Sequence, residues 1–205
     1  QGAPARLVYD EVALRRLAEG QERVDMVWLA NRSKVDPALV DSDGFLRMMF
    51  REGERVVVFT EQASQGQAVW PEDGLPEARA QGMWFLIQPV TGEAVKVERL
   101  KRPSRRCEEC VTRWRYALIE SDEAPVGLWL RWLVRLRLPI AAVYSSGGRS
   151  VHALVKVDAV CKSHWDRVVM PLKRALEGVG ADAGAMTGVR LSRLPGQWRA
   201  EKGQW

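Results

Sequence analysis

The sequence predicts an α+β fold, and three features of the chain support this prediction. Short apolar runs rich in β-branched residues, such as Arg55–Thr60 (RVVVFT), have the composition of buried strands. Longer segments, such as residues 128–136, carry apolar residues at helical spacing. With 205 residues, of which 46% are hydrophobic, the chain can bury a core as one domain or as two closely packed subdomains.

The first half of the chain is predicted to mix helices and strands. Apolar residues recur at helical spacing in residues 9–19, and Asp41 to Asp43 offer an N-cap for a second helix that ends near Gly53. Strands are expected at residues 26–29, 55–60, 83–87 and 94–97, and loops at residues 71–81 and 99–106.

The second half is predicted to be more regular. Strands are expected at residues 113–119, 139–144 and 151–157, and helices at residues 128–136 and 160–176, the second bent at Pro171. A Gly-Gly turn at Gly147 and Gly148 joins the second and third strands. This β-α-β-β-α order, completed by a last short strand, is typical of a ferredoxin-like or RRM-like sheet.

Charge and cysteine content narrow the classes of function. A formal net charge of +5, supplied mostly by arginine, suits a partner that carries phosphates. Three cysteines leave at least one unpaired and indicate a reducing, cytoplasmic location. The apolar run 128–140 contains three arginines, so we expect no membrane span. Because the chain starts without Met, we expect it to be part of a longer protein.

Two carboxylates follow the strand expected at residues 113–119. Glu120 and Asp122 are two residues apart, and residues two apart on a strand point to the same face. We therefore expect both carboxylates to converge on one point. Oxygen donors of this kind suit hard divalent cations such as Mg²⁺ or Mn²⁺, and do not suit zinc.

Polar residues also flank the Gly-Gly turn. Ser150 and His152 are two residues apart and share one face of the next strand, as does Lys156. A serine hydroxyl can donate to a phosphate oxygen, an imidazole can bridge one, and backbone N–H groups near Gly148 can approach a polyphosphate. A tight hairpin that binds no ligand is the alternative interpretation.

A third polar group lies near the end of the chain. Asp182 supplies one more carboxylate, and the arginines that follow offer guanidinium groups suited to phosphate: Arg190, Arg193 and Arg199. We expect Arg193 to clamp a triphosphate, with Arg190 and Arg199 as the next candidates.

In this order, the three groups resemble the motifs of the archaeo-eukaryotic primase superfamily: an acidic pair, an S-x-H triplet and a later single Asp. The second motif reads SGGRSVH here, with Arg149 where relatives often have Lys, and the third is followed by RLSRLPG at residues 190–196. The chain is most similar to primase-polymerases of bacterial phages, plasmids and mobile elements. The strong part of the resemblance covers about residues 105–200. Glu120 departs from the superfamily's commonest Asp by one methylene, a difference that bears on metal preference and leaves both Mg²⁺ and Mn²⁺ open.

The resemblance implies a primase catalytic core, with an N-terminal α/β subdomain (about residues 1–105) packed on an RRM-like subdomain (about residues 106–205). It implies a nucleotidyltransferase that adds dNTPs or NTPs to a primer on a single-stranded DNA template, and that also initiates primers. Glu120, Asp122 and Asp182 would hold two Mg²⁺ or Mn²⁺ ions, with Ser150 and His152 beside the phosphates. A helicase or an accessory priming module is expected elsewhere in the full-length protein.

Four residues have the types and spacing of a structural zinc site: Cys107, Cys110, Cys161 and His164. An incidental set without metal is the competing interpretation, which we favour. A basic run nearby suits a DNA backbone, with a merely solvated loop as its alternative. The run comprises Lys101, Arg102, Arg105 and Arg106.

Two other functions fit parts of the sequence. One is a catalytically inactive domain of a mobile-element replication protein that binds nucleotides or single-stranded DNA. The other is a rolling-circle nickase, which needs paired metal-binding histidines and a nucleophilic Tyr. The chain has only two histidines, twelve positions apart, and this argues against the nickase.

Overall fold

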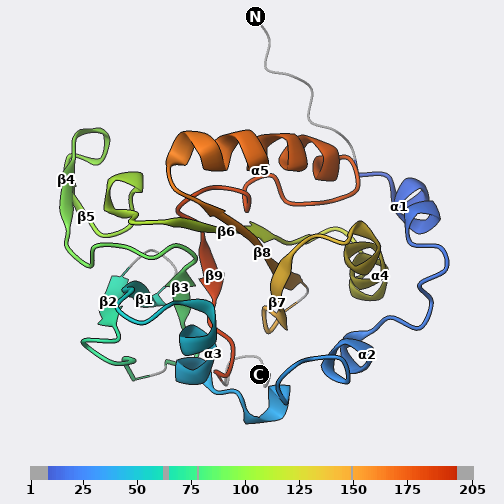
Figure 1. The fold of residues 1–205 in the computed structure, drawn as a ribbon, viewed down its shortest axis with the longest axis horizontal. Coiled ribbons are helices and arrows are strands. Elements are labelled where there is room, and N and C mark those ends of the chain that lie inside the picture. The colour runs from blue at the N-terminus through green and yellow to red at the C-terminus, as the bar shows by residue number, and fades with distance from the viewer. Residues whose placement is uncertain (1–8, 62–64, 78, 149, 198–205) are drawn as a thin grey trace, which may run out of the picture.

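Two antiparallel sheets form the centre of the molecule (Figure 1), of which residues 9–61, 65–77, 79–148 and 150–197 are described in this computed structural model. The larger sheet has the strand order β2-β1-β3-β9. Its strands are β1 (Val56–Glu61), β2 (Gln65–Trp70), β3 (Trp84–Leu86) and β9 (Leu191–Arg193). The smaller sheet has the order β6-β8-β7, from β6 (Trp114–Ile119), β7 (Ile140–Ser145) and β8 (Val151–Ala159).

Helices and a small hairpin surround these sheets. The α-helices are α1 (Glu11–Leu17), α2 (Met26–Ala30), α3 (Ser42–Met49), α4 (Val126–Leu136) and α5 (Lys162–Glu177). The hairpin pairs β4 (Val95–Val97) with β5 (Arg102–Ser104). Three short 3-10 helices are η1 (Pro37–Leu39), η2 (Glu98–Leu100) and η3 (Glu108–Cys110). The fold class is therefore α+β, as predicted.

The smaller sheet follows the predicted element order β6-α4-β7-β8-α5. Helix α4 carries the chain from β6 to β7, and β8 returns between them, antiparallel to both. The predicted Gly-Gly hairpin is confirmed, since β7 pairs directly with β8 and Tyr144 lies opposite His152. On the other side, Ile119 lies opposite Ala153, so the chain leaves β6 beside His152.

The last strand does not join this sheet. β9 pairs with β3 in the larger sheet, where Ser192 lies opposite Phe85. Leu191 and Leu194 are buried there, in the clusters on the two faces of that sheet. The larger sheet therefore contains strands from both sides of the boundary expected near residue 105.

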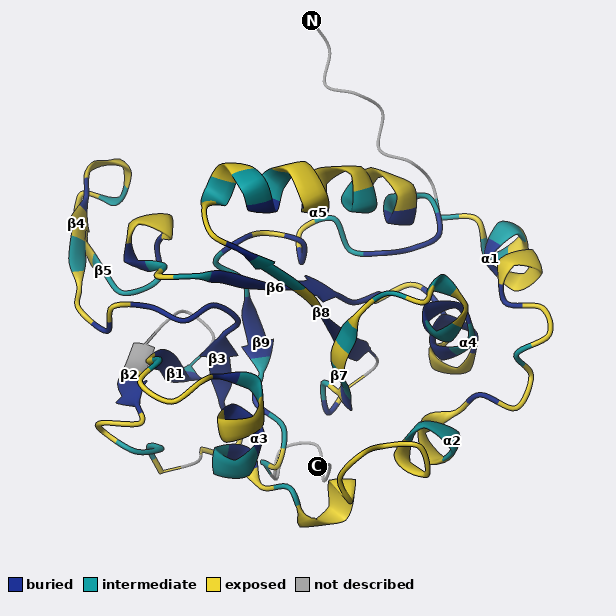
Figure 2. Ribbon diagram, viewed as in Figure 1, coloured by how far each residue is buried: buried dark blue, intermediate teal, exposed yellow. Residues whose placement is uncertain are grey.

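The hydrophobic core has three layers. The first lies between the smaller sheet and the helices α1, α4 and α5, and includes Trp129 and Trp165. The second lies between the two sheets and is also covered by α3; Phe45, Phe85 and Leu154 belong to it. The third lies on the outer face of the larger sheet. Figure 2 shows that the central strands are buried, whereas α2 and the outer turns are exposed.

Two predicted segments differ from the structure. Residues 26–29, expected as a strand, form helix α2, because the Asp25 carboxylate caps the Trp28 N–H at 2.7 Å. Residues 99–106, expected as an exposed loop, contain η2 and β5, and the pairing of β5 with β4 supplies the backbone hydrogen bonds that a loop would leave to water.

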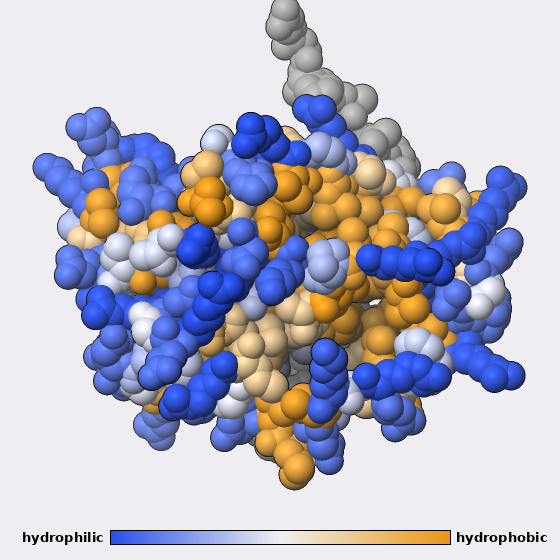
Figure 3. Space-filling model, viewed as in Figure 1, coloured by the Kyte–Doolittle hydropathy of each residue, from blue (hydrophilic) through white to orange (hydrophobic). Residues whose placement is uncertain are grey.

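The surface is mixed in character (Figure 3). Hydrophilic side chains gather over the β4–β5 side of the face shown, and hydrophobic ones project over η1, where Leu39 is 83% exposed. Within the described ranges, no helix combines the length and apolar character needed to cross a membrane.

Candidate functional site

Residues from all three motifs meet where β6 ends beside β8 and β9. Glu120 follows β6 directly and is buried, with 6% of its surface exposed. Its Oε2 atom lies 2.5 Å from His152 Nε2, and its Oε1 atom accepts a hydrogen bond from Arg190 Nη2 at 2.8 Å. The first motif therefore contacts the second motif directly, and the arginine after the third motif as well.

Asp182 reaches the same place through its backbone and through Arg190. The Asp182 N–H donates to the Glu120 carbonyl at 2.8 Å, and Arg190 Nη2 lies 3.6 Å from Asp182 Oδ2. A single guanidinium thus lies between two carboxylates that are 62 positions apart in the sequence. In their donor chemistry, Glu120 and Asp182 suit a hard cation, since both offer carboxylate oxygens to one positive group.

His152 has polar partners on both ring nitrogens. Its Nδ1 atom lies 2.8 Å from Ser192 Oγ, and Ser192 Oγ lies 2.6 Å from the Tyr144 hydroxyl. All three side chains are buried, Ser192 completely. The Tyr144 and His152 rings also pack edge to face across the β7–β8 hairpin, with centroids 5.5 Å apart. The imidazole is therefore fixed at both nitrogens.

The environment keeps Glu120 charged. Burial by itself raises the pKa of its carboxyl, but the hydrogen bonds and charges of His152 and Arg190 outweigh burial and lower the pKa below its ordinary value of 4.5. At neutral pH, Glu120 is therefore a carboxylate that can only accept hydrogen bonds.

Asp122 does not share this environment. The strand ends at Ile119, and Ser121 Oγ accepts hydrogen bonds from the Glu123 and Ala124 N–H groups, which turns the chain toward α4. Glu120 is buried and Asp122 is exposed, so the strand alternation that we expected for this pair does not apply. Across the described residues, no three His, Cys, Asp or Glu side chains form a group that could hold a metal ion.

The turn between β7 and β8 borders a small, open hollow. The segment from Ser145 to Gly147 lines one side, and Arg193 to Pro195 together with Gln197 line another. Ser150 is buried next to this turn, with its Oγ atom 3.1 Å from Ser146 Oγ, whereas Gly148 is exposed. The hollow thus joins the second motif to the run that follows the third.

The other predicted phosphate ligands lie around this region. The Arg193 guanidinium lies 3.7 Å from the centre of the Trp84 ring, on the opposite face of β9 from Ser192. Lys156 is exposed on β8. Arg199 and Arg149 lie outside the described residues.

The predicted basic run is only partly available to a ligand. Arg105 donates from Nε to the Gly92 carbonyl, and Arg106 donates from Nε to the Val189 carbonyl. Both side chains are half-buried: Arg105 holds the turn before β4, and Arg106 holds the loop before β9. Arg102 is exposed at the start of β5.

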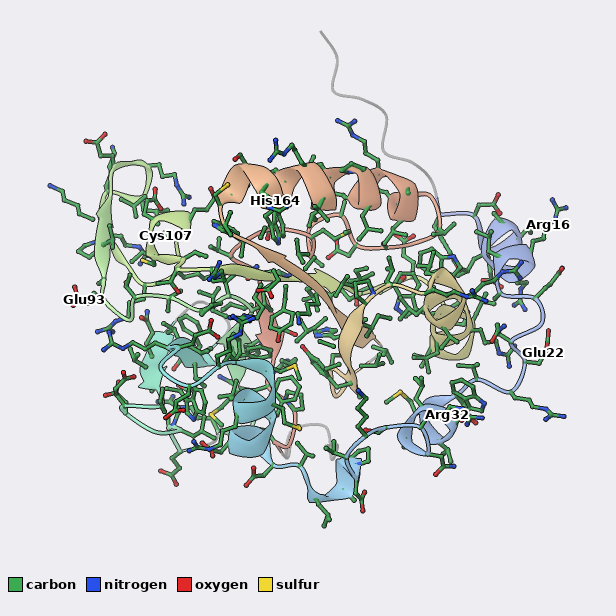
Figure 4. The ribbon with its side chains drawn as sticks, viewed as in Figure 1. Arg16, Glu22, Arg32, Glu93, Cys107 and His164 are labelled. Atoms are coloured by element: carbon green, nitrogen blue, oxygen red, sulfur yellow. The ribbon has the colours of Figure 1, made fainter. Side chains whose placement is uncertain are left out.

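The four residues with the spacing of a zinc site do not form a metal-binding group among the described residues. Cys107 and Cys110 are buried with their sulfurs 2.9 Å apart, and burial raises the pKa of Cys107 to about 12. Cys161 is exposed, and its sulfur lies 3.2 Å from Ser163 Oγ. Figure 4 shows Cys107 and His164 on separate elements, and no metal-holding group includes any of the four in the part of the chain described. The cysteine pair is instead part of the core beneath β1 and β3.

Sequence reasoning missed two members of the buried cluster, Ser192 and Tyr144. Ser192 lies between two arginines that suit phosphate, Arg190 and Arg193. Tyr144 ends the apolar run of a predicted strand, so neither residue stands out in the sequence. Strand alternation does place Ser192 on the opposite face from Arg193. The position of β9 against His152, however, depends on its pairing with β3. Local sequence patterns do not predict this long-range pairing.

The comparisons with known proteins identify no family for this chain. The comparison with protein-family models found no match. The comparison with curated proteins and the comparison with solved structures found no match either.

Proposed function

We propose that this chain is the catalytic domain of a DNA primase-polymerase of the superfamily that its motifs resemble, with residues 106–197 as its RRM-like part. The observation that carries the proposal is the convergence at Glu120. His152 of the second motif lies 2.5 Å away, and Arg190 links Glu120 to Asp182 of the third motif. Motifs that are far apart in the sequence meet in one buried, charged cluster, as a nucleotidyl-transfer site requires.

In this proposal, Glu120 and Asp182 would hold two Mg²⁺ or Mn²⁺ ions, with Asp122 completing the set from the exposed turn. Such ions would supply charge that lowers the pKa of a primer 3′-hydroxyl and stabilises a departing pyrophosphate. His152 and Ser150 contact the phosphates of the incoming nucleotide. The hollow beside Arg193 receives the triphosphate, and Arg190 neutralises its charge.

The partners follow from this chemistry. Single-stranded DNA template and primer are the polymeric substrates, and a dNTP or NTP is the third. The exposed Arg102, together with the net charge of +5, favours binding to a phosphate backbone. We place the protein in the cytoplasm, as part of a longer chain that includes a helicase or an accessory priming module.

Primer extension tests the proposal. The chain is incubated with a 5′-labelled primer on a DNA template, with dNTPs and either Mn²⁺ or Mg²⁺. We expect extension by the parent and none by the Glu120→Ala/Asp122→Ala variant. Asp166→Ala, which removes a half-buried carboxylate of α5 that pairs with Lys162 away from the motifs, is the control and should extend normally. A folded parent that binds primed DNA and dNTPs but leaves the primer unextended would refute the polymerase assignment.

One observation favours a second candidate, an inactive domain that binds nucleotides or single-stranded DNA. Both Glu120 oxygens are engaged by His152 and Arg190, Asp122 is exposed, and no three-ligand group occurs among the described residues. In that case the parent would bind labelled nucleotide or single-stranded DNA without extending a primer, and Glu120→Ala would leave binding unchanged. Strand cleavage would instead support the nickase.

A further inference from the structure

The β4–β5 hairpin and its flanks hold most of the net positive charge of the chain. Residues 93–106 contain six basic and two acidic residues, a formal charge of +4, whereas the whole chain carries +5. The hairpin lies at the edge of the molecule, outside the two central sheets (Figure 1), and hydrophilic side chains gather over it (Figure 3). The rest of the chain is therefore nearly balanced in charge, and one small element carries the excess.

The structure divides the six cations into two groups. Arg105 and Arg106 are half-buried, and each donates from Nε to a backbone carbonyl. The other four are exposed: Lys96, Arg99, Lys101 and Arg102. The cations that a ligand can reach therefore differ from the run expected from the sequence, because two of them lie earlier in the hairpin.

The hairpin brings the four exposed cations together. Lys96 lies opposite Pro103 in the pairing of β4 with β5, so it is next to Arg102 across the strands. Arg99 belongs to η2, which joins the two strands, and Lys101 follows η2 directly. Strands in a sheet lie about 4.7–4.9 Å apart and rise about 3.3 Å per residue, so the four Cα atoms lie within about 12 Å of one another.

Ion pairs neutralise little of this charge. In the part of the chain described, only Arg99 among the four reaches a carboxylate, that of Glu109 at 3.9 Å, and both side chains are about half exposed. Surface ion pairs of this kind contribute little. Neighbouring cations in the hairpin are closer than the Debye length of about 8 Å at physiological ionic strength, so they repel one another. A polyanion bound along the hairpin relieves that repulsion.

The surface of the hairpin indicates what kind of polyanion it fits. None of the large, exposed hydrophobic side chains lies in residues 93–106, all of which are described, and Val95, Val97 and Leu100 pack inward on the core. Elements that bind membrane surfaces combine basic side chains with apolar ones. Double-stranded DNA presents one negative charge per about 1.7 Å of its axis and needs no apolar contact. The hairpin therefore suits a nucleic-acid backbone better than a membrane.

The hairpin is also connected to the candidate site. Arg106 follows β5 closely and donates to the Val189 carbonyl at 3.1 Å. The next residue, Arg190, pairs with Glu120. Four residues span at most about 14 Å, so Arg102 cannot be further than that from Arg106. A DNA strand that occupies the candidate site is therefore within reach of the exposed cations.

We propose that the β4–β5 hairpin binds the phosphate backbone of primed DNA through Lys96, Arg99, Lys101 and Arg102. The contacts are independent of base sequence, because exposed lysines and arginines that meet phosphates position a protein on DNA without reading its bases. The identity of the polyanion as primed DNA rests on the proposed function, whereas the binding of a phosphate backbone does not require catalysis.

Fluorescence anisotropy with a labelled primer–template, measured over a range of salt concentrations, tests the inference. The hairpin variant replaces its four exposed cations by Gln. The control variant removes the same number of exposed cations on α1, around α2 and on α5, and Figure 4 shows Arg16 of α1 at the opposite edge of the molecule from Glu93. The control substitutions are Arg16→Gln, Arg23→Gln, Lys34→Gln and Arg174→Gln.

The two variants have the same net charge but should bind differently. Each phosphate contact contributes about 0.7–0.9 to the slope of log K against log salt, so the hairpin variant should have a slope shallower by about 3 and bind about 10- to 1000-fold more weakly at 100 mM salt. The control should keep the parent slope. A folded hairpin variant with the parent slope would overturn the inference, as would a control that loses as much.

Single substitutions provide a second test if the fourfold variant does not fold. Lys96→Gln and Arg102→Gln should each make the salt slope shallower by about 1, and an unchanged slope in both would contradict the inference. Vesicles that contain phosphatidylserine test the other polyanion. Binding of the parent to these vesicles but not to primed DNA would show that the hairpin meets a membrane surface instead.

Kinetics separate this inference from the proposed function. If the parent extends primers, the hairpin variant should raise KM for primed DNA by about the factor found for Kd, while kcat at saturating DNA and KM for the nucleotide stay unchanged. A raised nucleotide KM with unchanged DNA binding would refute the role given to the hairpin. A parent that binds primed DNA through the hairpin but extends nothing would refute the polymerase and leave this inference standing.

Discussion

The cluster around Glu120 and the four residues Cys107, Cys110, Cys161 and His164 differ in what brings their members together. In the Glu120 cluster, Glu120 follows β6 directly, and His152, Ser192 and Tyr144 lie on strands. The pairing of β6 with β8 carries Glu120 to His152, and the stacking of the two sheets brings Ser192 to Tyr144. In the cysteine set, Cys107 and Cys110 meet only because they flank one short turn.

A weak ion pair links the segment of Cys107 and Cys110 to the start of α5, which carries Cys161 and His164. Lys162 at the start of α5 lies 3.6 Å from Glu108, and both side chains are partly exposed. Surface pairs of this kind contribute about 0–1 kcal/mol, too little to hold four ligands around a point. Motif spacing therefore identifies candidate residues, while strand register and core packing determine which candidates meet.

The strongest test of this comparison removes the packing between the sheets. Phe85 is fully buried there and contacts Phe45 and Phe50 edge to face. Phe85→Ala should reduce the free energy of unfolding by about 3–5 kcal/mol, measured by urea denaturation. Leu39→Ala, at a position that is 83% exposed, is the control and should cost little. A small loss for Phe85→Ala would show that the Glu120 cluster does not depend on this layer.

A second test concerns the loop that carries Arg190 toward Glu120. A Cβ atom at Gly188 would lie 2.2 Å from the Trp114 ring, so Gly188→Ala should destabilise the protein by about 1–3 kcal/mol through overpacking. At Gly127 in α4, an added Cβ meets nothing within 4 Å, and Gly127→Ala should stabilise by about 0.5–1 kcal/mol. Thermal unfolding of both variants checks the pair, and equal shifts would contradict the close packing of this loop.

A third test uses pH. Because the pKa of Glu120 is lower in the folded protein than its ordinary value of 4.5, its contribution to stability is fully present above about pH 4.5 and is lost as pH falls toward the folded pKa. In Glu120→Gln, the amide NH₂ group must face either His152 or Arg190 as a competing donor. This should cost about 1–2 kcal/mol at pH 7.

The difference between Glu120→Gln and the parent should therefore shrink as the pH is lowered below about 4.5. Urea denaturation at pH 7 and at several lower pH values measures it. A difference that grows with acidity would mean that the carboxyl is not held in its charged form.

The smallest effect is expected in the cysteine set. Cys161 is exposed and its sulfur bonds only neighbouring groups of Ser163 and His164 among the described contacts, so Cys161→Ser should change the free energy of unfolding by less than about 0.5 kcal/mol. Adding a chelator to the parent should leave Tm unchanged. One bound zinc per chain that is lost in Cys161→Ser would show that the four residues do assemble into a metal site.

Local patterns predicted much of the fold because local physics controls those features. The β7–β8 hairpin follows from its glycine turn, and the buried strands β1 and β6 follow from their apolar runs. The strand predicted at residues 26–29 was wrong. The Asp25 side chain caps the Trp28 N–H three residues later, and this local N-cap favours helix α2 over a strand in so short an apolar run. Strand β5 was missed because its residues, Arg102 to Ser104, are polar and gain strand structure only by pairing with β4.

Residue patterns alone predict the α+β class, the element order from β6 to α5, and Glu120, His152, Asp182 and Arg190 as candidate site residues. The three-dimensional packing adds that β9 joins the larger sheet, that Ser192 and Tyr144 complete the cluster, and that Asp122 is exposed. The reason is that composition and periodicity act over a few residues, whereas strand pairing joins residues such as His152 and Ser192, which are 40 positions apart. Their meeting depends on the whole core that presses the two sheets together.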